Sequence, residues 1–237
     1  MTRGVAARKN GLVIAIDGPS GAGKSTVTSR LAKRLGYKQI DTGAMYRAVA
    51  WLISQAGIDP NDTAELERFC NEVDVRFNCA NGTRRVLANG QDVTDHIRTP
   101  EMSLMTSRIS ALRPVREAMM RSQRFMGRDG GVVLEGRDIG TVVFPDAELK
   151  FFLSASAEER GRRRYAELIA KGEQVTLEET IAAVVQRDHQ DSQRDLAPLR
   201  QAEDAIPIDS SGMEVDEVLD RMEAIFRDKI NQAGTKE

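Results

Sequence analysis

Gly18-Pro19-Ser20-Gly21-Ala22-Gly23-Lys24-Ser25-Thr26 is the stretch that decides the fold, and it follows the apolar run of residues 12–16. The pattern G-x-x-x-x-G-K-[ST], placed after a strand and before a helix, predicts a phosphate-binding loop. Its glycines let successive backbone N–H groups curl around an anion, and the next helix points its positive end at the same place. We therefore expect residues 18–26 to bind the phosphates of a nucleoside triphosphate.

Two side chains of this loop have chemistry suited to that task. Lys24 reaches the outer phosphates in such loops, and a hydroxyl such as that of Ser25 is a ligand for Mg²⁺. A Gly-rich turn without function would explain neither the Lys-Ser pair nor the flanking strand and helix. The sequence thus predicts a bound nucleoside triphosphate with Mg²⁺ as its metal.

Length and charge restrict the remaining possibilities. The chain has 237 residues, enough for one sizeable α/β core with small insertions, and its net charge is -2. Such a balance gives no global field that would recruit nucleic acid or an anionic membrane. Of the 34 basic residues, 26 are Arg, the side chain suited to forked contacts with phosphate. We expect small-molecule substrates, no nucleic-acid or membrane partner, and a monomer.

The two cysteines, Cys70 and Cys79, lie apart and lack metal-ligand spacing. With no secretory signal at the start of the chain, they predict free thiols in the reducing cytoplasm. Residues 1–10 are basic and polar, and we expect a frayed tail there.

Strands and helices alternate along the first part of the chain. Apolar spacing predicts a helix after the phosphate loop that stops at Gly36, a strand near residues 37–40, and a second helix that Gly57 closes. This order predicts a parallel sheet with right-handed crossovers, whose ligands bind at the carboxyl ends of the strands.

Residues 58–100 have a different character. Asp62-Thr63-Ala64-Glu65 resembles a capping box for a helix, and the turns Asn81-Gly82 and Asn89-Gly90 separate short alternating strands. A small antiparallel meander inserted into the parallel scheme is the expected result. The residues favour neither a decorative insert nor a mobile flap over the site.

A second buried-type strand at residues 132–134 delivers Glu135-Gly136-Arg137-Asp138 to the sheet edge that carries the phosphate loop. Glu135 has the chemistry to hold Mg²⁺ through water, and Arg137 to clamp a phosphate. The alternative is an exposed turn with a local ion pair.

Ser156-Ala157-Glu158-Glu159 has the pattern of a capping box at the start of one helix, and a second capped helix begins at Thr176. The first carries Arg160, Arg162, Arg163 and Arg164, and the second runs towards Arg187-Asp188-His189-Gln190-Asp191-Ser192-Gln193-Arg194. A helical hairpin with this arginine cluster suits a lid that neutralises phosphate charge and excludes water. For any single Arg, a solvated helix face is the simpler interpretation.

Several segments together resemble bacterial-type cytidylate kinase, in the same order from about residue 11 to residue 228. They are residues 18–26, 41–47, 92–94, 97–99, 115–117, 136–145 and 187–188. The block of residues 136–145 is far more specific than the phosphate loop. The resemblance implies a nucleoside monophosphate kinase fold that converts ATP plus CMP or dCMP to ADP plus CDP or dCDP with Mg²⁺.

The resemblance also implies a domain plan: a core of residues 11–57, 101–154 and 193–230, a monophosphate-binding insert of residues 58–100, and a lid of residues 155–192. It assigns acceptor contacts to Thr42, Tyr46, Arg47, Ser107, Arg116, Arg137, Asp138, Arg187, Asp191 and Arg194. Among these, Thr42, Arg47, Arg137 and Arg194 would hold the acceptor phosphate, Arg187 and Asp191 the sugar, and Ser107, Arg116 and Asp138 the cytosine. Lys24, Arg137, Arg163 and Arg164 would stabilise the transferring group.

Such a reaction needs no protein nucleophile and no general base, because the acceptor phosphate is already ionised. Two alternatives remain at the level of sequence. One is another P-loop small-molecule kinase acting on UMP, dTMP or shikimate, against which residues 136–145 argue. The other is a nucleotide switch of the GTPase type, whose Asn-Lys-x-Asp motif the sequence lacks.

Overall fold

We describe a computed structural model of the chain in which residues 8–80 and 83–234 are defined. These residues form two compact units, one within residues 8–39 and 129–234 and the other within residues 40–128. The first unit contains the phosphate loop and both predicted lid helices, and the second contains the whole predicted insert.

A five-stranded sheet has the order β2-β6-β1-β7-β8. Its strands are β1 (Val13–Asp17), β2 (Lys38–Asp41), β6 (Val132–Gly136), β7 (Leu149–Ser154) and β8 (Ile206–Asp209). β1 pairs in parallel with β6 and β7, and β7 pairs in parallel with β8. The predicted parallel sheet is thus confirmed, and β1, with its five buried residues, lies at its centre.

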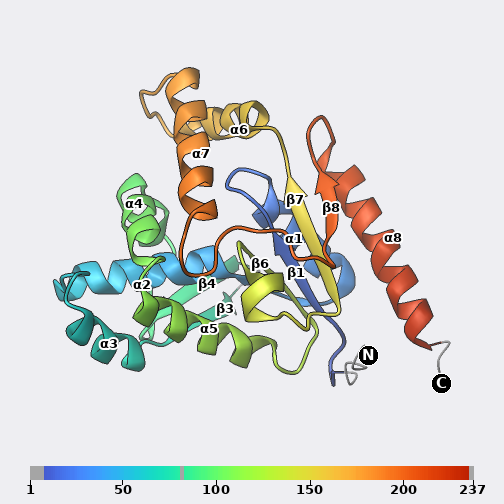
Figure 1. The fold of residues 1–237 in the computed structure, drawn as a ribbon, viewed down its shortest axis with the longest axis horizontal. Coiled ribbons are helices and arrows are strands. Elements are labelled where there is room, and N and C mark those ends of the chain that lie inside the picture. Colours follow the sequence, from blue (N-terminus) through green and yellow to red (C-terminus); the bar gives the residue numbers. More distant parts are fainter. Residues whose placement is uncertain (1–7, 81–82, 235–237) are drawn as a thin grey trace. The chain divides into compact units, whose positions relative to one another are not determined.

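Two helices bury their apolar faces on this sheet, α1 (Lys24–Leu35) and α8 (Val215–Gly234). Val27 and Leu31 of α1 and Leu219 and Met222 of α8 join Ile14 and Phe151 in one core cluster. Figure 1 shows α8 in red alongside β8. Their packing fixes α1, and therefore the loop in front of it, to the central strand.

The hairpin of α6 (Ala157–Ala170) and α7 (Leu177–Ser192) lies beyond the carboxyl ends of β7 and β8 (Figure 1). Both predicted N-caps are present, because Ser156 accepts from the N–H of Glu159 and Thr176 from that of Glu179. Only Thr176 completes the reciprocal capping box. The Glu159 carboxylate instead accepts from Arg163 Nε at 3.0 Å, one helical turn later.

The second unit combines helices with a small meander. Its helices are α2 (Thr42–Ala56), α3 (Thr63–Glu72), α4 (Pro100–Ile109) and α5 (Arg113–Gly127), and its antiparallel strands are β3 (Val75–Ala80), β4 (Thr83–Ala88) and β5 (Gln91–Asp92). Asn89 and Gly90 have φ values of 49° and 82°, as a two-residue hairpin turn requires. The other predicted turn, Asn81-Gly82, lies outside the described residues.

Residues 1–7 of the expected N-terminal tail also lie outside the described residues. Arg8, within the same expected tail, pairs with Asp146 at 2.6 Å and with Glu148 at 3.0 Å. Within residues 8–80 and 83–234, no helix has both the length and the apolar character needed to span a bilayer.

Candidate active site

The loop between β1 and α1 has the backbone of an anion-binding cradle. Gly18, Gly21 and Gly23 have positive φ values of 148°, 79° and 86°, which glycine tolerates best. Gly23 is the N-cap of α1, and no described side chain caps that helix. The first N–H groups of α1 therefore keep their capacity to bind phosphate oxygens.

Lys24, the first residue of α1, folds back over this loop. Its side chain is buried, and its Nζ donates to the carbonyl oxygen of Pro19 at 2.5 Å. Burial, together with the nearby Arg137, lowers the pKa of Lys24 below its ordinary value, while Glu135 and Asp17 oppose that shift. Two cations so close together are favoured when an anion lies with them, which is what a polyphosphate supplies.

Ser25 and Glu135 meet at the carboxyl ends of β1 and β6. The Ser25 hydroxyl donates to Glu135 Oε2 at 2.6 Å, and Gln39 Nε2 donates to Glu135 Oε1 at 3.1 Å. Glu135 itself is buried. A hydroxyl and a carboxylate are the oxygen donors that Mg²⁺ uses beside nucleotide phosphates, so these residues fit that metal. In the described part of the chain, no group of three or more His, Cys, Asp or Glu could hold a metal by protein ligands alone.

Three of the predicted acceptor-site residues contact one another at the end of α7, where Arg137 and Arg194 both bond to Asp191. Arg137 Nε donates to Asp191 Oδ2 at 2.9 Å, and Arg194 donates to Asp191 Oδ1. Burial of the Asp191 carboxyl would raise its pKa, but Arg137, Arg194 and Arg187 outweigh burial, and the pKa is lowered. Asp191 is therefore a carboxylate that aligns two guanidinium groups.

The turn after β6 continues from Arg137 and the buried Asp138 into a π-helical turn, η2 (Ile139–Val143). No periodicity predicted this turn. Such turns are rare and often occur at functional sites. Its first two residues, Ile139 and Gly140, are buried.

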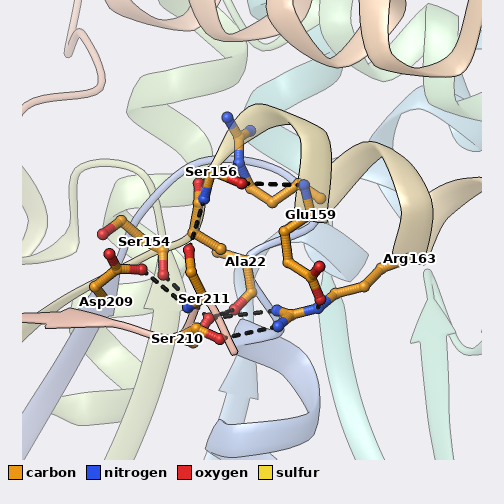
Figure 2. Close-up of polar contacts among 10 residues, drawn as sticks. Ala22, Ser154, Ser156, Glu159, Arg163, Asp209, Ser210 and Ser211 are labelled. Atoms are coloured by element: carbon orange, nitrogen blue, oxygen red, sulfur yellow. Dashed lines mark hydrogen bonds and ion pairs between the residues drawn. The ribbon is translucent and has the colours of Figure 1, made fainter. Parts of the chain in front are cut away.

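The lid arginines chosen from the sequence have local partners. Figure 2 shows Arg163 pointing towards Ser210, whose carbonyl and hydroxyl oxygens accept from its guanidinium at 2.9 and 3.3 Å. The Ser210 hydroxyl also lies 3.4 Å from the carbonyl oxygen of Ala22 in the phosphate loop. Arg164 pairs with Glu167 at 2.9 Å on the half-exposed side of α6. Among the described residues, the ion pairs of Arg163 and Arg164 are made with Glu159 and Glu167, not with Asp191.

Arg160 makes closer contact with the phosphate loop than either residue that the sequence singled out. Its guanidinium is buried, donates to the carbonyl oxygens of Ser20 at 3.0 Å and Ala155 at 2.9 Å, and pairs with Asp188 of α7 at 2.6 Å. Among four arginines on one helix, composition does not distinguish the buried one. The available signal was position, because Arg160 lies one turn after the Ser156 cap, at the end of α6 that follows β7.

The remaining predicted acceptor residues belong to the unit of residues 40–128. Thr42 begins α2 and is buried, and Tyr46 follows one turn later, with the Arg116 guanidinium 5.8 Å from its ring centroid. Arg116 Nη1 also donates to the carbonyl oxygen of Ser110 at 3.1 Å. Arg47 lies on α2 and Ser107 on α4, where the carbonyl oxygen of Ser107 accepts from the Ser110 hydroxyl.

Comparison with known proteins adds to this geometry. The cytidylate kinase family profile matches residues 14–228. A protein named cytidylate kinase from Geobacter sulfurreducens is 62% identical over 224 residues, which cover 94% of this chain and 96% of that protein. A cytidylate kinase from Citrifermentans bemidjiense is 60% identical over 227 residues, which cover 96% of this chain and 97% of the relative.

Among solved structures, an uncharacterized protein from Eubacterium ventriosum has the same fold. Its TM-score is 0.51 at 12% sequence identity, and the match covers 92% of this chain and 98% of that one. At such low identity the likeness concerns the fold alone.

Proposed function

The chain belongs to the cytidylate kinase family, and on that premise we propose that it transfers the γ-phosphoryl group of ATP to CMP or dCMP, giving ADP and CDP or dCDP. The observation that carries the proposal is the arrangement at the carboxyl ends of β1 and β6. There the Ser25 hydroxyl of the phosphate loop bonds to Glu135, and Arg137, two residues beyond Glu135, bonds to the buried Asp191, which also holds Arg194. Phosphoryl transfer needs such cationic groups around both phosphates.

On this proposal, the phosphate loop of residues 18–26 binds the donor. Backbone N–H groups at the start of α1 bind the phosphates, and Lys24 leaves the Pro19 carbonyl to contact the transferring group. Ser25 and Glu135 would hold Mg²⁺, Glu135 through water, and the metal would neutralise phosphate charge. Arg163 and Arg164 would add charge from the lid.

The acceptor phosphate would be held by Thr42, Arg47, Arg137 and Arg194. Asp191 bonds to Arg137 and Arg194 and orients them, and with Arg187 it would bind the sugar. In-line attack by the ionised phosphate oxygen then requires only correct placement and charge stabilisation, because no proton has to be removed first.

Ser107, Arg116 and Asp138 would read the base, with Tyr46 beside Arg116. Cytosine presents an N4 donor beside its N3 and O2 acceptors, so a carboxylate and a guanidinium match its edge. Uracil reverses part of this pattern and would leave a buried carboxylate facing an acceptor, which costs binding. The proposal further includes a monomer in the cytoplasm, where the buried free thiol of Cys70 would stay reduced.

The test is a coupled assay of ADP release with ATP and Mg²⁺ on CMP, dCMP, UMP, dTMP, AMP and shikimate in parallel. We expect strong turnover on CMP and dCMP and little on the others. The Lys24→Ala variant, purified identically, controls for a contaminating kinase. Preference for UMP, dTMP or shikimate would overturn the base-reading assignment, although the phosphate loop would keep its role.

A further inference from the structure

Asp17 is the last residue of β1 and the residue immediately before the phosphate loop, and the proposed reaction assigns it no task. It lies between Gly136 of β6 and Phe152 of β7 in the sheet register. Its side chain is only 4% exposed. A buried carboxylate is costly unless its oxygens are hydrogen-bonded, so its partners indicate why the residue is there.

The Asp17 carboxylate accepts two successive backbone N–H groups. Ile139 donates to Oδ1 at 2.9 Å, and Gly140 donates to Oδ2 at 2.7 Å. These are the first two residues of η2, directly after Arg137 and Asp138. Both oxygens of one side chain are therefore occupied in holding the turn that carries these two residues.

The turn also packs closely against its neighbours. A Cβ added to Gly140 would lie 3.4 Å from Asp17 Oδ2, an ordinary contact, and 3.0 Å from Lys150 Cδ, so the Lys150 side chain would have to shift by a few tenths of an ångström.

The Asp17 backbone is fixed equally firmly on the loop side. A Cβ on Gly18 would lie 1.9 Å from the carbonyl oxygen of Leu153, so the chain leaves β1 in direct contact with β7. The position of Asp17 in the sheet is thus fixed. The turn that its carboxylate holds is therefore also fixed relative to the phosphate loop.

We infer that Asp17 is a positioning residue that sets the spacing between the phosphate loop and Arg137, its backbone continuing into the loop and its carboxylate anchoring the turn after Arg137. It touches neither substrate and acts through Arg137. The inference rests on the proposed function for the role of Arg137, but the anchoring geometry does not depend on which acceptor the enzyme uses.

The first test is Asp17→Asn, which keeps the side-chain volume but replaces one acceptor oxygen by an NH₂ group facing a backbone N–H. We expect kcat/KM for CMP to fall at least tenfold, while the Kd for ADP measured by calorimetry changes less than threefold. The control is Asp62→Asn, because Asp62 also accepts a backbone N–H, from Glu65 at 2.9 Å, at the start of α3. This control should leave both constants unchanged. A stabilising role alone would instead lower the thermal stability and leave the kinetics of the folded enzyme unchanged.

A double-mutant cycle with Arg137→Ala tests whether Asp17 acts through Arg137. If it does, Asp17→Asn should reduce kcat/KM by less than threefold in the Arg137→Ala background. An equal loss in both backgrounds, or a loss shared by ADP and CMP, would overturn the inference. Should Asp17→Asn fail to fold, Asp17→Glu keeps the charge and displaces the carboxylate by one methylene, and the same selective loss is expected.

The result is separable from the fate of the proposed function. If the wild-type enzyme turns over a different acceptor, the same cycle is run with that acceptor, and selective loss there supports Asp17 while the base assignment fails. If the wild type is active and the folded Asp17→Asn variant has normal kinetics, this inference is wrong while the proposed function stands.

Discussion

At the scale of single residues, the sequence identified functional residues that a motif or a strand end places, and missed those whose role depends on burial. Lys24 and Ser25 were identifiable because the loop motif fixes their spacing, and Arg137 because it follows a buried strand. Asp17 and Arg160 escaped because an Asp beside a glycine and an Arg among arginines are common. Only the folded chain shows that both are buried and hold backbone groups.

Replacement of Arg137 by Ala should impair turnover far more than folding. The substitution removes a cation proposed to stabilise the transferring group, a loss on the order of 3 kcal/mol, or about a hundredfold in kcat/KM. Kinetics on CMP beside a thermal melt measure the two effects. Arg34→Ala is the control, because Arg34 pairs only with acids of α8 on the exposed surface. Near-normal kinetics of the folded Arg137 variant would contradict the role.

Asp17 also predicts a pH dependence of the free energy of unfolding. Burial raises the pKa of its carboxyl from 3.8 to about 6, aided by Asp138 and opposed by the two N–H bonds and Lys24. Between these two pH values the unfolded chain loses the proton while the folded chain keeps it, so stability falls as pH rises. The stability that the Asp17 carboxyl contributes below pH 3.8 is lost as the pH rises through its folded-state pKa of about 6.

The difference in unfolding free energy between wild type and Asp17→Asn isolates this contribution from other groups. Between about pH 4 and pH 7, the unfolding free energy of the wild type should fall by on the order of 3 kcal/mol relative to that of Asp17→Asn. Urea unfolding at several pH values measures it. A constant difference across that range would show that the Asp17 pKa is the same in the folded and unfolded chain.

At the scale of elements, local signals predicted the helices well and the unusual turn not at all. The capping box expected at Ser156 forms only in part, because the carboxylate of Glu159 binds Arg163, whereas Thr176 and Glu179 form the full reciprocal box. The sequence spacing allows Glu159 to bond either to the backbone of Ser156 or to Arg163, and only the folded structure shows which bond forms. The π turn of residues 139–143 has no sequence period of its own, because Asp17, distant in sequence, anchors its first residues.

The contact between α6 and α7 depends on Gly161. A Cβ there would lie 2.3 Å from Ile181 Cγ1 and 3.1 Å from Ile181 Cα. Ala is favoured over Gly in a helix by about 1 kcal/mol. We nevertheless expect Gly161→Ala to destabilise the enzyme, because overpacking costs about 1–3 kcal/mol. Chemical denaturation measures the change, and Ile181→Ala in the same chain should relieve part of it. Additive effects of the two substitutions would contradict this account.

At the scale of the whole molecule, the alternation of strands and helices was sufficient to predict the parallel sheet. The extent of each compact unit was less accessible. Composition changes at residues 58 and 100, whereas the second unit spans residues 40–128, because α2 packs against α4, against α5 and against strands β3 and β4 of the meander. Such packing joins helices whose sequences look like those of the core. The assignment of insert and lid therefore remains a prediction.

Nucleotide binding should stabilise the whole molecule by mass action. At a ligand concentration of about 100 times Kd, a bound nucleotide adds about 2.7 kcal/mol. For a chain of this size that corresponds to a rise in Tm of roughly 5–10 °C. We expect ATP to raise the Tm of the wild type and of Lys33→Ala, whose side chain is exposed on α1, but much less that of Lys24→Ala. An equal rise in all three would remove Lys24 from the donor site.

The close fit of Gly161 against Ile181 has a practical side for anyone who follows the α6–α7 hairpin in solution. Helices that interlock without room for one extra carbon share a single set of coordinates, so a reporter on either of them reads the position of both. With a reference label elsewhere in the chain, one spin label at exposed Glu173, between the two helices, is enough to follow the hairpin, and a second label on the hairpin would add only redundancy.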